Sequence, residues 1–286
     1  MARNGISTWF DGDWHDGDVA IMSAADHGTW LGTLVFDGAR TFGGKSPDLD
    51  LHCQRIVASA GAMAMNAPVS AEDIEGLVRE RIGTADRSAQ LYIRPMMWSR
   101  SAAPGLIAPD PDDVGFAICI EEMPMALPGD AYTLGVSPFR RPRQDMAVCE
   151  AKAGCLYANN GRIMADARKR GFHNALSLDF EDNVAETASS NVFLVRDGHI
   201  STPKPNGTFL AGITRMRVME LLREDGVEVE ETVLTLDDFE DADEIFLTAN
   251  ANKITPITRY KDRDMGPGQM SGRAHALYLD YAASGS

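Results

Sequence analysis

The stretch E-A-K-A-G-C-L-Y-A-N-N, residues 150–160, places a lysine among unusually small neighbours. Lys152 is one of six lysines in the chain, and it alone lies between two alanines, Ala151 and Ala153. We therefore expect its side chain to have no open route to solvent. Burial disfavours the ammonium form of a lysine, and the neutral amine is the form that attacks carbonyl carbons. The alternative is a lysine at a strand edge, with its stem packed and its head in water.

The length and composition around this stretch are those of a globular protein. A chain of 286 residues can hold one large or two modest domains, and contents of 44% hydrophobic and 24% charged residues are ordinary for a soluble protein. No apolar run approaches the length of a membrane-spanning helix, and the N-terminus lacks the apolar segment of a secretory signal. We expect no association with a membrane.

The cysteines and the charge exclude further classes of function. Cys53, Cys119, Cys149 and Cys155 include no C-x-x-C pair, which favours reduced thiols in the cytoplasm over a disulfide framework or a metal site. The net charge of -15 argues against a nucleic-acid partner, which needs a basic surface. Six of the 27 basic residues are lysines and the rest are arginines, so individual arginines are candidate anion ligands.

The N-terminal part of the chain contains two candidate binding features. Residues 50–65 have the spacing of a helix, and Arg55 falls beside its apolar stripe, either as a salt-bridged arginine or as an anion ligand. Residues 91–98, L-Y-I-R-P-M-M-W, read as a strand that places Tyr92 and Arg94 on one face. One hydroxyl and one guanidinium facing the same space could bind a carboxylate, and an exposed Tyr-Arg pair is the alternative.

The composition shifts at M-P-M-A-L-P-G-D-A-Y, residues 123–132, which has two prolines and a glycine. We interpret residues 125–131 as a linker between a smaller N-terminal domain, residues 1–124, and a larger domain, residues 132–286. The glycines of residues 26–45 fit turns as readily as a ligand loop.

Two features of the C-terminal half suggest chemistry. In V-A-E-T-A-S-S-N-V-F, residues 184–193, Glu186 precedes small residues and could face a pocket. The loop T-F-L-A-G-I-T-R, residues 208–215, leads into an amphipathic helix with Thr214 at its start and Gly226 beyond its end. Free N–H groups at a helix start, together with a hydroxyl, can bind a phosphate. The alternative for Thr214 is an ordinary N-cap.

A reactive lysine, a carboxylate, an anion site and a carboxylate clamp are the parts that a pyridoxal-phosphate enzyme requires. The sequence resembles the fold type IV pyridoxal-phosphate aminotransferases, and most closely the branched-chain amino acid aminotransferases. In the N-terminal part, L-G-T-L-V-F-D-G-A-R (31–40) is similar to the family's Y-G-x-x-x-F-E-G-x-R, H-C-Q-R (52–55) to its H-x-x-R, and L-Y-I-R-P (91–95) to the Y-x-R-P of the branched-chain group.

The remaining motifs follow in the family's order. A-K-A-G-C-L-Y (151–157) resembles A-K-x-G-x-N-Y, E-T-A-S-S-N-V-F (186–193) resembles E-x-x-x-x-N-x-F, and L-A-G-I-T-R (210–215) resembles L-P-G-I-T-R. The resemblance assigns covalent Schiff-base attachment of the cofactor to Lys152, contacts with the cofactor to Arg55, Tyr157, Glu186, Ile213, Thr214 and Asn250, and contacts with the substrate to Leu31, Phe36, Tyr92, Arg94 and Ala251.

The resemblance implies an α/β (α+β) fold with a small α/β domain and a larger domain that has a barrel-like sheet. It implies a homodimer or higher homo-oligomer, with each site completed by the neighbour's loop around residues 27–36. The implied reaction is a ping-pong transfer of the amino group of a branched-chain or other hydrophobic L-amino acid to 2-oxoglutarate. No metal ion is implied.

The chain departs from the family pattern at Leu31, where the family has tyrosine, and at A-N-A-N (249–252), where the family has G-T-A-A. These departures keep other activities of the same fold open: an (R)-amine or D-amino acid transaminase, or a 4-amino-4-deoxychorismate lyase. A protein that binds the cofactor without turnover is the rival from another class. The presence of Lys152, Tyr157 and Glu186 together argues against it.

Overall fold

The computed structural model describes residues 5–125, 132–266 and 268–284, and most of the predicted linker, 126–131, lies outside them. The chain divides into two compact units. The first unit comprises Met1–Met125, Ala151–Cys155 and Ala282–Ser286, and the second comprises Ala126–Glu150 and Leu156–Tyr281.

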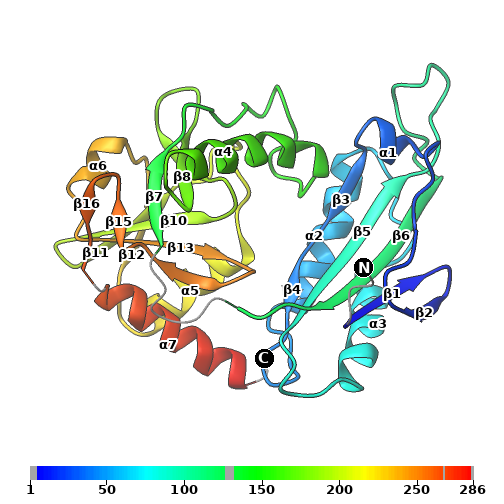
Figure 1. The fold of residues 1–286 in the computed structure, drawn as a ribbon, viewed down its shortest axis with the longest axis horizontal. Helices are drawn as coiled ribbons and strands as arrows, with labels where there is room; N and C mark the ends of the chain where they lie inside the picture. The colour runs from blue at the N-terminus through cyan, green and yellow to red at the C-terminus, as the bar shows by residue number, and fades with distance from the viewer. Residues whose placement is uncertain (1–4, 126–131, 267, 285–286) are drawn as a thin grey trace. The chain divides into compact units, whose positions relative to one another are not determined.

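The first unit is a sheet covered by helices (Figure 1). Its elements are β1 (Ile6–Phe10), β2 (Asp13–Asp16), α1 (His27–Trp30), β3 (Leu34–Phe36), β4 (Ala39–Arg40), α2 (Leu49–Ala62), α3 (Ala71–Gly83), β5 (Leu91–Ser99) and β6 (Val114–Glu122). The strands are antiparallel in the order β2-β1-β6-β5-β3, with β4 also paired to β5. Helix α2 packs against β3 and β5, and α3 packs against α2.

Local sequence signals explain several boundaries in the first unit. The hairpin between β1 and β2 turns at Asp11 and Gly12, which both have positive φ, as the D-G pair favours. Ser70 begins α3 in a capping box with Asp73. Buried Ile56, Ile74 and Ile93, one each from α2, α3 and β5, join these elements in the core.

The second unit contains two sheets and their covering helices (Figure 1). Its elements are β7 (Thr133–Val136), α4 (Tyr157–Lys169), β8 (Asn174–Leu178), β9 (Val184–Thr187), β10 (Asn191–Arg196), β11 (His199–Pro203), α5 (Ile213–Glu224), β12 (Val229–Thr232), α6 (Leu236–Glu240), β13 (Glu244–Ala249), β14 (Lys253–Pro256), β15 (Arg259–Tyr260), β16 (Arg263–Asp264) and most of α7 (Gln269–Ser284). A short 3-10 helix, Gly154–Leu156, precedes α4.

The predicted barrel-like sheet consists of two five-stranded sheets that share one apolar core. Their strand orders are β12-β11-β10-β13-β14 and β16-β15-β7-β8-β9. Leu176 and Val184 of one sheet lie in the same buried cluster as Val192 and Leu247 of the other. Helix α4 connects the parallel strands β7 and β8 and packs on both, which covers the second sheet on its outer side.

The lysine stretch departs from the predicted division of the chain. Residues 132–286 were expected to form one domain, but Ala151–Cys155 pack with the first unit. The N–H of Phe36 donates to the carbonyl of Lys152 at 3.1 Å, and Ala153 forms an antiparallel bridge with Val35. The backbone of this stretch therefore continues the sheet of the first unit beside β3.

Candidate functional site

Lys152 is fixed through its backbone. Its N–H donates to Ser59 Oγ at 3.1 Å, and its carbonyl accepts from Phe36 on β3. The small neighbours reflect crowding against β3, because a Cβ on Gly154 would lie 2.9 Å from Leu34 Cδ2. Lys152 Nζ lies 4.9 Å from the centroid of the Phe36 ring, so the structure brings these two predicted site residues together.

The prediction that Lys152 has no route to solvent is wrong. Ala151 and Ala153 are buried, but Lys152 itself is half-buried. The small residues allow the close approach of β3, which pairs with Ala153 through Val35, and they do not bury the lysine. The structure thus presents a lysine whose backbone is held by hydrogen bonds, whose amine lies beside an aromatic ring and whose side chain is partly accessible to a ligand.

Arg55, on α2, forms an ion pair with the buried Asp37. Its Nε and Nη2 donate to the two carboxylate oxygens at 2.7 and 2.8 Å, and His52 Nδ1 lies 2.7 Å from Asp37 Oδ1. Burial alone would raise the pKa of Asp37, but Arg55 and His52 outweigh it and hold that pKa well below its usual range. The salt-bridged reading of Arg55 is therefore confirmed, and a contact with phosphate stays a prediction.

Tyr92 and Arg94 share a face of β5, as the alternation of the strand predicts. The guanidinium carbon of Arg94 lies 5.3 Å from the centroid of the Tyr92 ring. Tyr92 also sets the shape of the neighbouring loop, because a Cβ on Gly38 would lie 2.2 Å from its hydroxyl. Only glycine fits at that position.

Sequence reasoning missed the partner of Arg94. Arg94 Nη2 donates to Glu121 Oε1, on the adjacent strand β6, and the Glu121 side chain is only 13% exposed. Glu121 lies opposite Tyr92 in the register of β5 and β6. A charged residue that follows the apolar run V-G-F-A-I-C-I was the available signal, but its partner is distant in sequence. Arg94, which is predicted to bind the substrate carboxylate, therefore already binds the carboxylate of Glu121.

Glu186, on β9 in the second unit, is buried with an arginine. Arg141 Nε lies 3.2 Å from Glu186 Oε1, and both side chains are less than a tenth exposed. Arg141 also donates to Asn160 Oδ1 at 2.5 Å and to the Thr208 carbonyl at 3.1 Å. In the sequence Arg141 lies in R-R-P-R, residues 140–143, where nothing local indicates a buried partner. Because unpaired buried charges are costly, this network fixes the Glu186 carboxylate in one orientation.

The start of α5 has the features of an anion site. Its N-cap is Gly212, which has no side chain to cap the helix, and Thr214 is the second helical residue, so the ordinary N-cap reading of Thr214 is wrong. Asn191 Nδ2 donates to the Leu210 carbonyl at 2.9 Å. A Cβ on Gly212 would lie 2.2 Å from Asn191 Oδ1, so the tight approach of the loop requires glycine.

Two buried donors lie at the end of β13, a strand that packs against α5. Thr248 pairs with Asn191 in the ladder of β13 and β10, and Asn250 is the first residue after β13. Within the part of the chain that the structure describes, Thr248 Oγ1 and Asn250 Nδ2 have no hydrogen-bond partner. Buried donors without acceptors are uncommon in native proteins. Together with the uncapped helix start they fit a phosphate, so the residues present suit pyridoxal phosphate.

The other predicted residues have surface or helix-terminal positions. Tyr157 is the first residue of α4 and is half-buried. Ile213 is the first residue of α5 and is buried. Leu31, the C-cap of α1, is 39% exposed, and Ala251 is exposed in the turn between β13 and β14.

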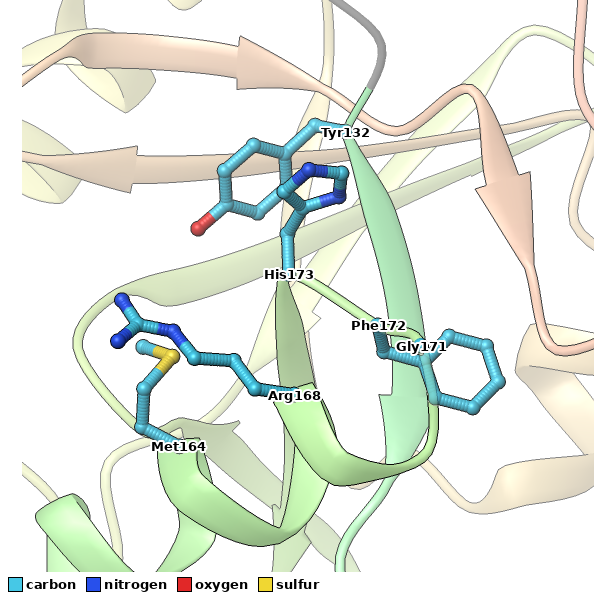
Figure 2. A pocket seen from close by; sticks show the side chains of 6 residues that line it. All are labelled: Tyr132, Met164, Arg168, Gly171, Phe172 and His173. Atoms are coloured by element: carbon cyan, nitrogen blue, oxygen red, sulfur yellow. The ribbon is translucent and has the colours of Figure 1, made fainter.

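Surface hollows elsewhere in the second unit do not contain these residues. One, of about 340 Å³, is lined by Tyr132, Met164, Arg168, Gly171, Phe172 and His173 (Figure 2). There the ring of Tyr132 stacks on His173 with centroids 5.1 Å apart. Among the described residues, no cluster of three or more histidine, cysteine or acidic side chains could hold a metal ion, and no helix is long and apolar enough to span a membrane.

Comparisons with known proteins give consistent relatives. A family model described as amino-transferase class IV matches residues 34–260. An aminotransferase from Brucella abortus, solved with the cofactor PLP, is 48% identical with a TM-score of 0.95, over 98% of this chain and 99% of that one. A branched-chain aminotransferase from Thermoproteus uzoniensis, solved with norvaline, is 26% identical with a TM-score of 0.87, over 99% of this chain and 96% of that one.

A sequence relative extends the same pattern. The branched-chain-amino-acid aminotransferase of Pseudomonas aeruginosa is 30% identical over 290 residues, which cover 98% of this chain and 92% of that protein. These similarities extend over nearly the whole chain. They therefore include parts of both units.

Proposed function

Since this chain belongs to the class IV aminotransferases, we propose that it moves the amino group of a hydrophobic L-amino acid, branched-chain ones foremost, to 2-oxoglutarate. It is an aminotransferase with the mixed helix and sheet fold of that family, and it depends on pyridoxal phosphate. The observation that carries the proposal is the amine of Lys152, which is anchored at its backbone and lies beside the Phe36 ring. The two half-reactions follow a ping-pong order.

The cofactor supplies a carbonyl carbon that takes up the amino group and a ring that accepts electrons. Lys152 would hold the cofactor covalently through that carbonyl carbon, and its amine, when free, would move a proton at the substrate Cα. Glu186, oriented by Arg141, would keep the pyridine nitrogen protonated. Tyr157 would contact the cofactor near its O3′.

The phosphate contacts come from donors that need an acceptor. Ile213 and Thr214 offer the N–H groups of an uncapped helix start, and Asn250 offers a buried amide with an unpartnered nitrogen. Arg55 is the further contact, although Asp37 already accepts two of its hydrogen bonds. The phosphate would thus be bound by backbone and amide N–H groups and by the dipole of α5, in addition to the guanidinium of Arg55.

The substrate contacts come from both polar and apolar residues. Tyr92 and Arg94 bind the carboxylate, and Phe36, Leu31 and Ala251 contact the side chain. The apolar ring of Phe36 beside the reacting amine favours a hydrophobic amino donor. The names of the branched-chain relatives support the same class of substrate.

A homodimer in the cytoplasm is the proposed assembly, with a small amino donor and a 2-oxo acid as its partners. Trp30 and Leu31, at the end of α1, are 53% and 39% exposed. Adjacent exposed apolar side chains of this size mark an interaction surface, and a second copy of the chain would cover them. The four cysteines are free thiols, in keeping with a reducing compartment.

A second candidate is an (R)-amine transaminase on the same fold. The observation in its favour is the ion pair between Arg94 and Glu121, because a guanidinium with a protein carboxylate attracts a substrate carboxylate less strongly. A donor without a carboxylate would need no clamp.

Half-reactions of the purified holoenzyme distinguish the two candidates. L-leucine should shift the visible absorbance band of the bound cofactor to shorter wavelength, with D-leucine and (R)-1-phenylethylamine much slower. A shift with (R)-1-phenylethylamine alone would replace the proposal with the second candidate. No band in the presence of added pyridoxal phosphate would refute both.

A further inference from the structure

Lys253 combines two unfavourable features. It is the first residue of β14, it has a left-handed backbone with φ of +57°, and it is only 3% exposed. A non-glycine residue at positive φ is strained, and a buried lysine loses its hydration. In the sequence it follows N-A-N, residues 250–252, which does not indicate burial. A lysine that is kept despite a strained backbone and a buried ammonium is expected to have a role that offsets both unfavourable features.

The ammonium of Lys253 has defined contacts. Its Nζ donates to Asn250 Oδ1 at 2.6 Å, and it lies 5.3 Å from the centroid of the Tyr278 ring on α7. The first contact is a charge-assisted hydrogen bond, and the second is a cation–π contact. Both hold the ammonium inside the second unit.

The contact with Lys253 determines which way the Asn250 amide faces. An ammonium donates and never accepts, so it selects the oxygen of the amide and excludes the flipped orientation. The amide nitrogen then points away from Lys253. Asn250 Nδ2 is buried and finds no acceptor among the described residues. Leaving such a donor unpaired is unfavourable, so the arrangement requires an acceptor from a ligand.

Two further donors belong to the same part of the second unit. Thr248 Oγ1, near the end of β13, is also buried and unpartnered in the described structure. The uncapped start of α5 lies beside Asn191, the ladder partner of Thr248. Three kinds of donor with no acceptor point to an anion. Arg55, in contrast, already donates twice to Asp37, which neutralises its charge.

We propose that Lys253 is a positioning residue for the phosphate of pyridoxal phosphate: it orients the Asn250 amide so that Nδ2 donates to a phosphate oxygen. This inference rests on the proposed function, since it takes the cofactor's phosphate as the acceptor. It assigns a purpose to the buried ammonium, to the left-handed turn and to the unpartnered amide nitrogen together.

Cofactor affinity of the full-length protein tests the proposal. Lys253→Met keeps most of the side-chain length and removes the ammonium. Each protein is titrated with pyridoxal phosphate and, separately, with pyridoxal, which lacks the phosphate, while the visible band is followed. Lys253→Met should weaken the binding of pyridoxal phosphate about tenfold to a hundredfold, the loss expected for one charge-assisted hydrogen bond. The affinity for pyridoxal should stay within about threefold of the wild-type value.

Lys261→Met is the matched control. Lys261 also has a left-handed backbone, with φ of +51°, and its Nζ lies 5.2 Å from the Tyr260 ring centroid. Its side chain is 41% exposed and pairs with Glu240. We expect Lys261→Met to bind both forms of the cofactor like the wild type. Equal losses for the two lysine variants would overturn the proposal, because they would reflect a general effect of removing a turn lysine.

Asn250→Ala completes the test. It should show the same phosphate-specific loss, and adding Lys253→Met to it should cost little more, because the lysine acts through the amide. If Lys253→Met fails to fold, Asn250→Ala decides alone, and an unchanged preference for pyridoxal phosphate over pyridoxal would overturn the proposal. If a variant lost the same affinity for pyridoxal as for pyridoxal phosphate, the proposal would also be overturned. A wild type without a visible band would instead refute the proposed function.

Discussion

Replacing Asp37 by asparagine removes the charge at the centre of the buried network of the first unit. Asp37 is fully buried and accepts two hydrogen bonds from Arg55 and one from the Gly38 N–H at 2.7 Å, with His52 Nδ1 also at 2.7 Å. Asparagine has nearly the same shape but only one carbonyl oxygen. The variant therefore removes the negative charge and places an amide nitrogen, which donates, where a carboxylate oxygen accepts.

The expected loss follows from burial. Breaking a buried ion pair costs about 3–5 kcal/mol, and we expect about 3 kcal/mol here, since the Arg55 side chain keeps 16% exposure and can regain some hydration. The pair of Glu75 and Arg79 on α3 offers a control. Its N–O distance is also 2.7 Å, but its side chains are 25% and 56% exposed. Glu75→Gln should therefore cost only about 0.3–0.5 kcal/mol.

Denaturant unfolding of both variants at pH 7, followed by circular dichroism, measures these losses. The pKa of Asp37 is depressed in the folded protein, so its contribution is full above the unfolded pKa of about 4 and falls as the pH drops below it. The gap between the free energies of unfolding of wild type and Asp37→Asn should shrink below pH 4. Equal losses for Asp37→Asn and Glu75→Gln would refute the argument from burial.

Three further substitutions test the site. Arg94→Ala should raise KM for substrates with a carboxylate about tenfold to a hundredfold and barely change KM for simple amines, as steady-state kinetics will show; equal effects on both would remove Arg94 from the clamp. Glu121→Gln frees Arg94 and should lower KM for 2-oxoglutarate roughly fivefold, and a higher KM would contradict the competition between the two carboxylates. Gly212→Ala should weaken the binding of pyridoxal phosphate more than the binding of pyridoxal, because its Cβ would collide with Asn191 Oδ1 and displace the start of α5. Unchanged affinities for both would show that this loop does not contact the phosphate.

Features with local causes could be predicted from the sequence. The capping box of Ser70 and Asp73 that begins α3 lies within four residues of sequence, and Gly226, with φ of +79°, follows α5 as predicted. The strand with Tyr92 and Arg94 on one face depends on alternation within a few residues. The resemblance to class IV aminotransferases rests on ordered motifs, and the family match confirms it.

Features that depend on distant partners could not be predicted. Arg141 lies in the basic run of residues 140–143, and only the folded second unit shows it buried against Glu186. Glu121 reaches Arg94 because β5 and β6 are neighbours in the sheet. Lys253 follows N-A-N in the sequence, which does not indicate burial, whereas in the structure it is buried at the hairpin between β13 and β14.

The small residues around Lys152 were misread for a related reason. They predicted burial of the lysine, but their cause is the close approach of β3, seen at Gly154 and Leu34. A run of small residues indicates that another backbone segment approaches closely, but it does not show whether the lysine side chain between them is buried. The same stretch was placed in the larger domain because it follows the linker in sequence, although its hydrogen bonds join it to the first unit.

The identity of the lysine that attaches to the cofactor is the most direct test of the proposed chemistry. Reduction of the holoenzyme with borohydride makes the attachment permanent, and peptide mass mapping then locates it. The label should be on Lys152, and Lys152→Ala should lose the label, the visible band and turnover while keeping the wild-type circular dichroism spectrum. A label on Lys253 or another lysine, or activity that survives in Lys152→Ala, would contradict the assignment.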